Sequence, residues 1–122
     1  MRDWKNIKFD YMLKDRVIAK VEITNGVVKV EHTKGVPKSL ALWNARNDIS
    51  LSDIYKQLSF MVFSRERVNR DELLEMLGIE EYDPKAIVEK THGVIATNYY
   101  WIRFEGENLT CRDVREWIGL DF

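Results

Sequence analysis

Asn25-Gly26 stands between two segments in which apolar and polar residues alternate, and this arrangement constrains the fold more than any other feature of the chain. Both residues tolerate the positive φ angles of a two-residue turn, so the pair is a strong hairpin signal. Segments 7–13 and 16–23 place apolar side chains at every second position, as half-buried strands do. With 27–32 as a third strand, the sequence predicts an antiparallel β-meander.

A small meander has an apolar face that other elements must cover, and the later sequence supplies helix signals for this purpose. Ser50 or Ser52 can cap a helix that runs to about Phe63, with apolar residues at helical spacing along it. Asn69 and Glu72 have the spacing of a capping box, in which each side chain bonds the backbone N–H of the other. This pair is therefore predicted to begin a second helix.

Further start and stop signals follow at short intervals. Gly78 is placed to end the second helix. Asp83 as cap and Pro84 at the first helical position begin a third helix, which Gly93 ends. These signals predict short helices joined by short connections rather than one long helix.

The remaining segments complete the expected architecture. Residues 33–49 are mixed, and SLALW at 39–43 is compatible with a short edge strand. Residues 99–104 indicate a late strand, and Thr110 with Asp113 caps a last helix. The predicted fold is a single α+β domain over 1–122 with three to four short helices: the β-meander at 7–32, a helical part at 50–92, and a C-terminal strand and helix at 99–118.

Charge and composition exclude several classes of protein. The chain has 19 Lys and Arg against 20 Asp and Glu, a net charge of −1, which argues against a nucleic-acid or membrane-surface binder. No apolar run approaches the ~18 residues of a membrane span. The start of the sequence lacks the apolar stretch of a signal peptide, and a single Cys allows no internal disulfide. We therefore expect a cytoplasmic protein.

The stretch YDPKAIVEKTHG at 82–93 contains His92, the first candidate for chemistry. As the last residue of a short helix, His92 is expected to bond free helix carbonyls and to favour the negative end of the helix dipole. A metal site would need more ligands, and no HxxxH, HExxH or CxxC motif is present. A nucleophilic pair would need Cys111 to meet His92 in space, with the helix start lowering the pKa of the thiol. Neither alternative has support in the sequence.

Nucleotide motifs are also missing, because the sequence contains no GxxxxGK, GxGxxG, HRD or DFG pattern. We therefore expect a protein that is not an enzyme and that uses no metal or other cofactor. The helix pair at 70–90 resembles a helix-turn-helix in outline, but Glu80, Glu81 and Asp83 precede its second helix and would repel phosphate. Nucleic-acid binding is accordingly disfavoured.

A contact surface remains as the expected kind of functional site. Exposed aromatic and arginine side chains contribute most of the binding energy at interfaces, and this chain is rich in both. Trp43 lies in the least regular segment, and alternation along the late strand points Tyr100 away from Tyr99 and Trp101. The candidate partner-binding residues are Trp43, Arg65, Arg67, Arg70, Tyr99, Tyr100 and Trp101.

Residues 8–32, KFDYMLKDRVIAKVEITNGVVKVEH, followed by VPKSLAL at 36–42, resemble the start of HipA-type Ser/Thr kinases. That family opens with three strands and then a Pro-x-Ser-Leu-x-Leu segment, here Pro37 to Leu42. The later part is similar to small stand-alone proteins of Clostridia-type bacteria that are encoded near HipA-like genes or on mobile elements. No part of the chain resembles the kinase lobe, so no catalytic residue of the family can be carried over.

The resemblance implies a non-catalytic module that binds a HipA-like kinase, as the separate small protein HipS does in some three-gene toxin–antitoxin systems. An antitoxin-like regulator is therefore the leading hypothesis. The alternative is an inhibitor of a bacterial defence system, carried by a phage or another mobile element and similar in role to an anti-CRISPR protein that binds a Cas nuclease. A DNA-binding autoregulator is a third hypothesis.

Overall fold

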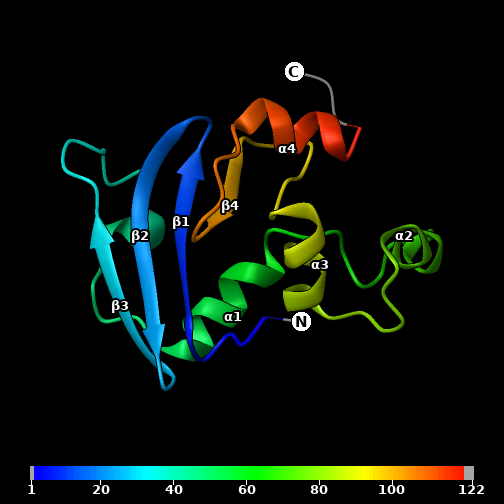
Figure 1. Ribbon diagram of the computed structural model, residues 1–122, viewed down its shortest axis with the longest axis horizontal. Helices are drawn as coiled ribbons and strands as arrows, with labels where there is room; N and C mark the ends of the chain where they lie inside the picture. Colours follow the sequence, from blue (N-terminus) through cyan, green and yellow to red (C-terminus); the bar gives the residue numbers. More distant parts are fainter. Residues whose placement is uncertain (1, 120–122) are drawn as a thin grey trace.

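The computed structural model describes residues 2–119 and shows an α+β fold, as the sequence predicts (Figure 1). The first three strands precede every α-helix along the chain, and the fourth strand lies between the last two α-helices. The elements are β1 (Ile7–Leu13), β2 (Arg16–Thr24), β3 (Val27–His32), the short turn η1 (Leu42–Ala45), α1 (Leu51–Ser59), α2 (Arg70–Leu77), α3 (Pro84–Thr91), β4 (Tyr100–Phe104) and α4 (Cys111–Trp117).

The four strands form one antiparallel sheet in the order β3-β2-β1-β4. The predicted meander is confirmed, and the positive φ angles of Asn25 (49°) and Gly26 (78°) make its second turn. The late strand β4 pairs with β1, where Phe9 lies opposite Phe104. A bulge between Tyr11 and Met12 shifts the register of β1 against β2.

One face of the sheet carries the main apolar core. The alternation in β1 and β2 directs their apolar side chains to this face, as a period of two requires. Helix α1 covers the face with Ile54 and Leu58, and α3 adds Val88. The buried members of this cluster are Trp4, Ile7, Phe9, Tyr11, Ala19, Val21, Ile23, Leu42, Ile49, Ile54, Leu58, Met61, Val88, Ile102 and Phe104.

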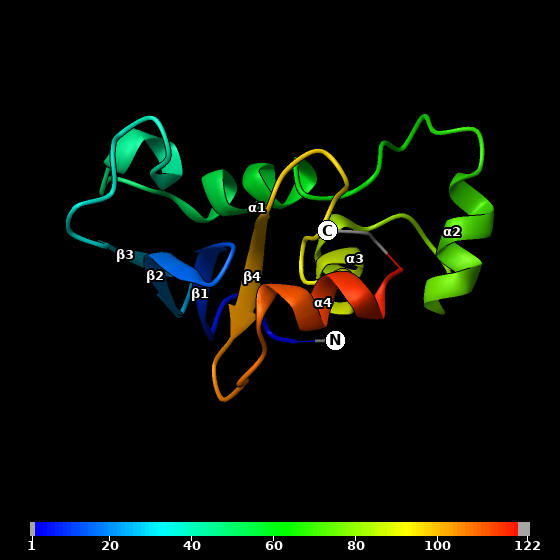
Figure 2. The ribbon, with the colours of Figure 1, turned by 90° about the horizontal axis from the view of Figure 1, so that it is seen from above.

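The opposite face of the sheet is divided into a covered end and an open end. Helix α4 lies on this side, across the sheet from α1 (Figure 2). It covers Met12 and Trp101 with Cys111 and Val114, which form a second buried cluster together with Val94. The rest of this face carries charged side chains in a hollow of about 590 Å³.

Most of the predicted capping residues are found at the helix ends. Ser50 and Thr110 make complete capping boxes at α1 and α4, and Asp83 caps α3 through the backbone N–H of Lys85. Asn69 makes no side-chain capping bond at α2, so that part of the prediction is wrong. Helix α1 also ends at Ser59, earlier than expected, and a turn follows at 60–61.

Residues 33–49 contain no strand, which corrects the expected edge strand at 39–43. The turn η1 has left-handed backbone angles, with positive φ at Trp43 (50°), Asn44 (53°) and Ala45 (65°). This turn places Leu42 in the core. Leu42 is therefore buried through a left-handed turn, and not through the alternation of a strand.

Candidate functional site

An apolar groove of about 760 Å³ lies between α2 on one side and α3, the segment 94–97 and the end of α4 on the other. Helix α2 stands at one end of the molecule, beyond α3 and away from the sheet (Figures 1 and 2). The lining residues are Val62, Phe63, Arg67, Leu73, Met76, Leu77, Ile87, Lys90, Thr91, Val94, Ile95, Ala96, Thr97, Trp117 and Ile118.

The α2 wall exists because this helix buries little of its apolar surface. Leu74 is the one buried residue of α2, while Leu73 and Leu77 are only half-buried and face the groove. Met76 is 82% exposed. Leucine spacing predicts that all three leucines face inward, but the sheet core is already covered by α1 and α3. The apolar face of α2 is therefore left partly without intramolecular contacts.

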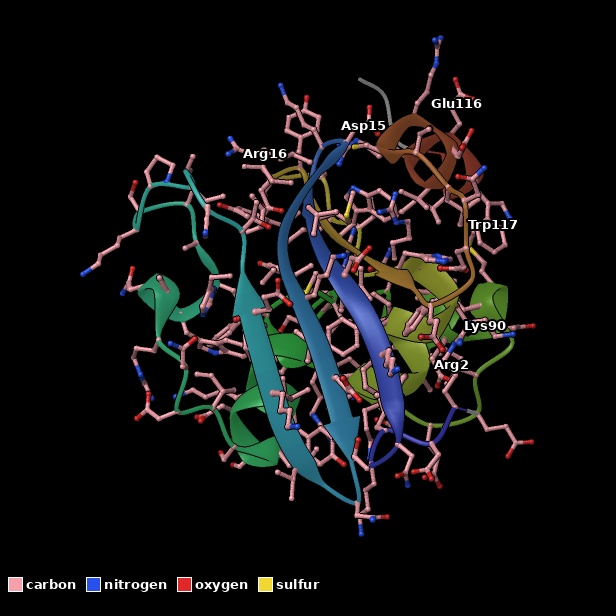
Figure 3. All side chains as sticks on the ribbon, turned by 60° about the vertical axis from the view of Figure 1, so that its left-hand side comes forward. Arg2, Asp15, Arg16, Lys90, Glu116 and Trp117 are labelled. Carbon is pink, nitrogen blue, oxygen red and sulfur yellow. The ribbon has the colours of Figure 1, made fainter. Side chains whose placement is uncertain are left out.

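The opposite wall ends in Trp117, whose side chain projects from the last turn of α4 (Figure 3). Trp117 is 68% exposed, and its ring lies 5.8 Å from the ring of His92, centroid to centroid. A tryptophan held at its base and exposed over the rest of its surface is a common anchor in protein interfaces. The groove thus has an exposed large apolar side chain on each wall.

Among residues 2–119, the charges that line the groove are all positive. They belong to Arg67 and Lys90, both of which are exposed, and no carboxylate of these residues lines the groove. The neighbouring Arg65 lies over the ring of Tyr82 at 4.8 Å, and Arg70 bonds the carbonyl of Arg65 at 3.2 Å. Of the arginines at 65, 67 and 70, the structure therefore brings only Arg67 to the groove.

The aromatic candidates lie elsewhere. Trp101 is 1% exposed, and its Nε1–H donates to the carbonyl of Lys14 at 2.6 Å, so it is a core residue and not a contact residue. Tyr100 stacks on Tyr11 with ring centroids 5.3 Å apart, on the sheet face opposite to Trp101. The predicted alternation along β4 is confirmed. Both faces of the sheet are covered at this strand, however, so Trp101 is not available as a contact residue.

Two further candidates are half-buried. Trp43 packs against the main core, so only part of its indole is available as a contact surface. Tyr99 lies between two cations, with Lys14 Nζ at 5.1 Å and the Arg115 guanidinium at 4.5 Å from its ring centroid. These aromatics hold loops in place and line no part of the groove.

His92 is buried (4% exposed) and adopts a left-handed conformation just after α3, with φ 58°. Its Nε2 lies 3.0 Å from Oε2 of Glu107, and Oε1 of Glu107 accepts the backbone N–H of Phe104 at 2.8 Å. The imidazole therefore bonds a carboxylate rather than the helix carbonyls, which corrects the sequence interpretation. The pair ties the end of α3 to the loop after β4.

A nucleophilic Cys–His pair would require Cys111 to lie beside this histidine. Cys111, the first residue of α4, is buried in the second cluster, and its backbone N–H donates to Oδ1 of Asp15 at 2.8 Å. Burial raises the pKa of the Cys111 thiol, the reverse of the effect expected from a helix start, and a raised pKa disfavours the nucleophilic thiolate. The Cys–His interpretation therefore gains no support from the geometry.

Residues 2–119 also bear on two other kinds of site. Within this range, no group of three or more His, Cys, Asp or Glu side chains could hold a metal ion. No helix in the same range is long and apolar enough to cross a membrane.

Comparisons of this chain with family models, curated proteins and solved structures find no match. The sequence predicts only part of the groove lining. The sequence pattern indicates Arg67 as a contact residue but does not indicate Met76 or Trp117. Their signal in the sequence is position, because each is an apolar residue that lies off the inward face of its helix.

Proposed function

We propose that this chain is a non-catalytic protein-binding module, and that its groove holds a segment of a partner protein. The observation that carries the proposal is the pair of exposed apolar side chains, Met76 and Trp117, on the two walls of one apolar groove. Methionine, tryptophan and arginine are enriched at interfaces, and Arg67 supplies the third of these types at the rim. Burying each large apolar side chain contributes about 1.5–3 kcal/mol.

The chemistry of the groove favours one kind of occupant, an acidic amphipathic helix. The apolar floor suits the side chains at positions i, i+3 or i+4, and i+7 of such a helix. Arg67 and Lys90 suit carboxylates on its flanks, because no acidic residue of the described part of the chain lines the groove and competes for them. A basic segment would meet two like charges and no counter-charge from these lining residues.

The resemblance of the N-terminal half to HipA-type kinases supports a HipA-like Ser/Thr kinase as this partner. In this proposal the chain is an antitoxin-like regulator, and the kinase supplies the acidic helix. The alternative partner is a bacterial defence protein such as a Cas nuclease, for an inhibitor carried by a mobile element. Both partners would use the same groove, so the same variants test them.

The test is co-expression of the tagged chain with a HipA-like kinase, followed by pull-down and measurement of growth arrest. Met76→Asp and Trp117→Ala should each weaken the complex about 30-fold or more, as expected for interface positions worth at least ~2 kcal/mol. Phe60→Asp is the matched control, because Phe60 is 65% exposed but does not line the groove.

Each outcome has a defined meaning. Loss of binding in the groove variants with retention in Phe60→Asp supports the proposal. Equal binding by all three variants rules out the groove as the contact site. The absence of a complex and of any change in kinase toxicity rules out the kinase. Unimpaired cleavage by every candidate Cas nuclease in the presence of the purified chain counts against the alternative partner.

A further inference from the structure

The two outer strands of the sheet differ in what covers their free edges. On the β4 side, the backbone N–H of Ile102 donates to the carbonyl of His92 at 2.7 Å, so the segment after α3 covers that edge. On the other side, β3 pairs with β2 alone (Figure 1). The segment 33–49, which follows β3, lies on the α1 side of the sheet (Figure 2).

The hairpin turn decides which backbone groups of β3 point outward. A two-residue turn at Asn25-Gly26 makes Thr24 and Val27 a hydrogen-bonded pair, and bonded pairs recur at every second residue of an antiparallel ladder. The N–H and C=O groups of the intervening residues therefore point away from β2. These residues are Val28, Val30 and His32, and no other backbone bond to them is found in the described part of the chain.

The open face of the sheet carries two rows of alternating charge that run across all four strands. The order of the charges in each row follows from the register of the paired strands, and the backbone bond from the N–H of Glu105 to the carbonyl of Lys8 places Glu105 beside Lys8. Lys8 Nζ lies 3.9 Å from carboxylate oxygens of both Glu22 and Glu105, and Arg103 Nη2 lies 3.0 Å from Oδ2 of Asp10. One row is Glu105, Lys8, Glu22 and Lys29, and the other is Arg103, Asp10, Lys20 and Glu31.

At the β3 edge, the two rows end in opposite charges. The first row ends in Lys29 and the second in Glu31, and both side chains are exposed. Cross-strand pairs of opposite charge stabilise neighbouring strands, whereas like charges directly opposite each other destabilise them. The edge therefore carries one positive and one negative position for any strand that pairs with it.

We propose that a second copy of this chain pairs with the β3 edge, strand β3 to strand β3, in antiparallel orientation about a two-fold axis at Val30. In this register the outward groups of Val30 bond those of Val30 in the second copy. Lys29 then lies opposite Glu31 of the second copy, and Glu31 lies opposite its Lys29. The two four-stranded sheets join into one.

Charge selects this register from those that the backbone bonds allow. A centre at Lys29 places two ammonium groups opposite each other, and a centre at Glu31 places two carboxylates opposite each other. The centre at Val30 pairs opposite charges on both sides of the axis. It also continues the alternation without a break, because Lys29 is followed by Glu31 and then Lys20 of the second copy.

The experiment uses sedimentation velocity and native mass spectrometry of the full chain. The wild type should dimerise with increasing concentration. Lys29→Glu and Glu31→Lys should each weaken self-association about tenfold or more, since each variant places like charges opposite each other at two positions. An equimolar mixture of the two variants should form a heterodimer, because both cross-axis pairs are then of opposite charge.

The control variant is Lys56→Glu, which has the same charge change as Lys29→Glu but on an exposed residue of α1. It should dimerise as the wild type does, because its β3 edge is unchanged. Met76→Asp should leave the wild-type dimer intact, which separates this edge from the proposed groove. A wild type that is monomeric at about 1 mM, or equal weakening by Lys56→Glu and Lys29→Glu, overturns the proposal.

A cross-linking experiment tests the register itself. Opposed residues of a pair without hydrogen bonds have Cα atoms about 4.5 Å apart, which is within the range for a disulfide. Lys29→Cys mixed with Glu31→Cys should form a mixed disulfide under mild oxidation, in preference to either homodimer. Cys111 is buried and should not compete. A predominance of Lys29→Cys homodimers would contradict the register.

Discussion

Gly93 allows a sharp prediction, because two separate costs would follow from one added methyl group. Its φ is +72°, a region that L residues with a Cβ rarely adopt. A Cβ built at this position would lie 2.6 Å from Cε and 3.3 Å from Cβ of Met61, a buried core residue. Gly93→Ala should therefore impose both backbone strain and a steric overlap at the junction between α3 and the groove.

The magnitude follows from the two costs taken together. A left-handed alanine costs about 1–2 kcal/mol, and overpacking of a filled core costs about 1–3 kcal/mol. Gly93→Ala should therefore lower the free energy of unfolding by about 2–5 kcal/mol. Gly78 is the matched control, since its φ is also +72° but no atom lies within 4 Å of its added Cβ. Gly78→Ala should cost only about 1–2 kcal/mol.

Urea denaturation of the three proteins, followed by tryptophan fluorescence and far-UV circular dichroism, measures both differences. A second comparison adds Met61→Ala to Gly93→Ala. Truncation of Met61 removes the atom that makes the closest contact, so the two substitutions should be non-additive by about 1–3 kcal/mol in the favourable direction. Equal destabilisation by Gly93→Ala and Gly78→Ala would refute the argument that contact with Met61 limits this position.

Two predictions concern the helix ends. Thr110→Ala should lower the free energy of unfolding by about 1 kcal/mol, because it removes a complete capping box. Asn69→Ala should change it by less than about 0.5 kcal/mol, because Asn69 makes no capping bond. Parallel thermal melts compare the two variants, and equal losses of stability would contradict the assignment. Hydrogen bonds from Ser50 and Thr110, the backbone N–H groups first, lower the pKa of Asp53 and Asp113 below 3.8. The stability that these caps contribute is present above pH 3.8 and is lost as the pH falls through the lowered folded-state pKa. The double variant Asp53→Asn/Asp113→Asn should therefore lose less stability than the wild type between about pH 5 and about pH 2. An unchanged slope of stability against pH in acid denaturation would count against this prediction.

The candidate site shows where sequence reasoning reaches its limit. Arg67 was predicted as a contact residue from its type alone, and it does line the groove. Trp101 was predicted in the same way, yet it is buried beneath α4. Alternation tells which side chains share a face of β4, but it does not tell whether each face is covered. Coverage depends on helices that are distant in the sequence.

The buried pair of His92 and Glu107 shows the same limit at the level of single contacts. The helix end at 91–93 was predicted from local signals, and α3 does end there. The partner of the imidazole was not predicted, because Glu107 follows fifteen residues later, beyond β4. No periodic pattern links the two residues. Their contact exists because β4 returns along β1 and brings the next loop to the end of α3.

The sequence by itself determined the β-meander, its turn at Asn25-Gly26 and most helix ends, since each depends on the backbone preferences of residues within a few positions of one another. Only the tertiary structure decided that β4 pairs with β1, that Trp101 is buried, and that α2 stands apart from the sheet and leaves a groove. These features depend on which apolar surfaces are covered first. That competition involves the whole chain, and no short segment contains the information to decide it.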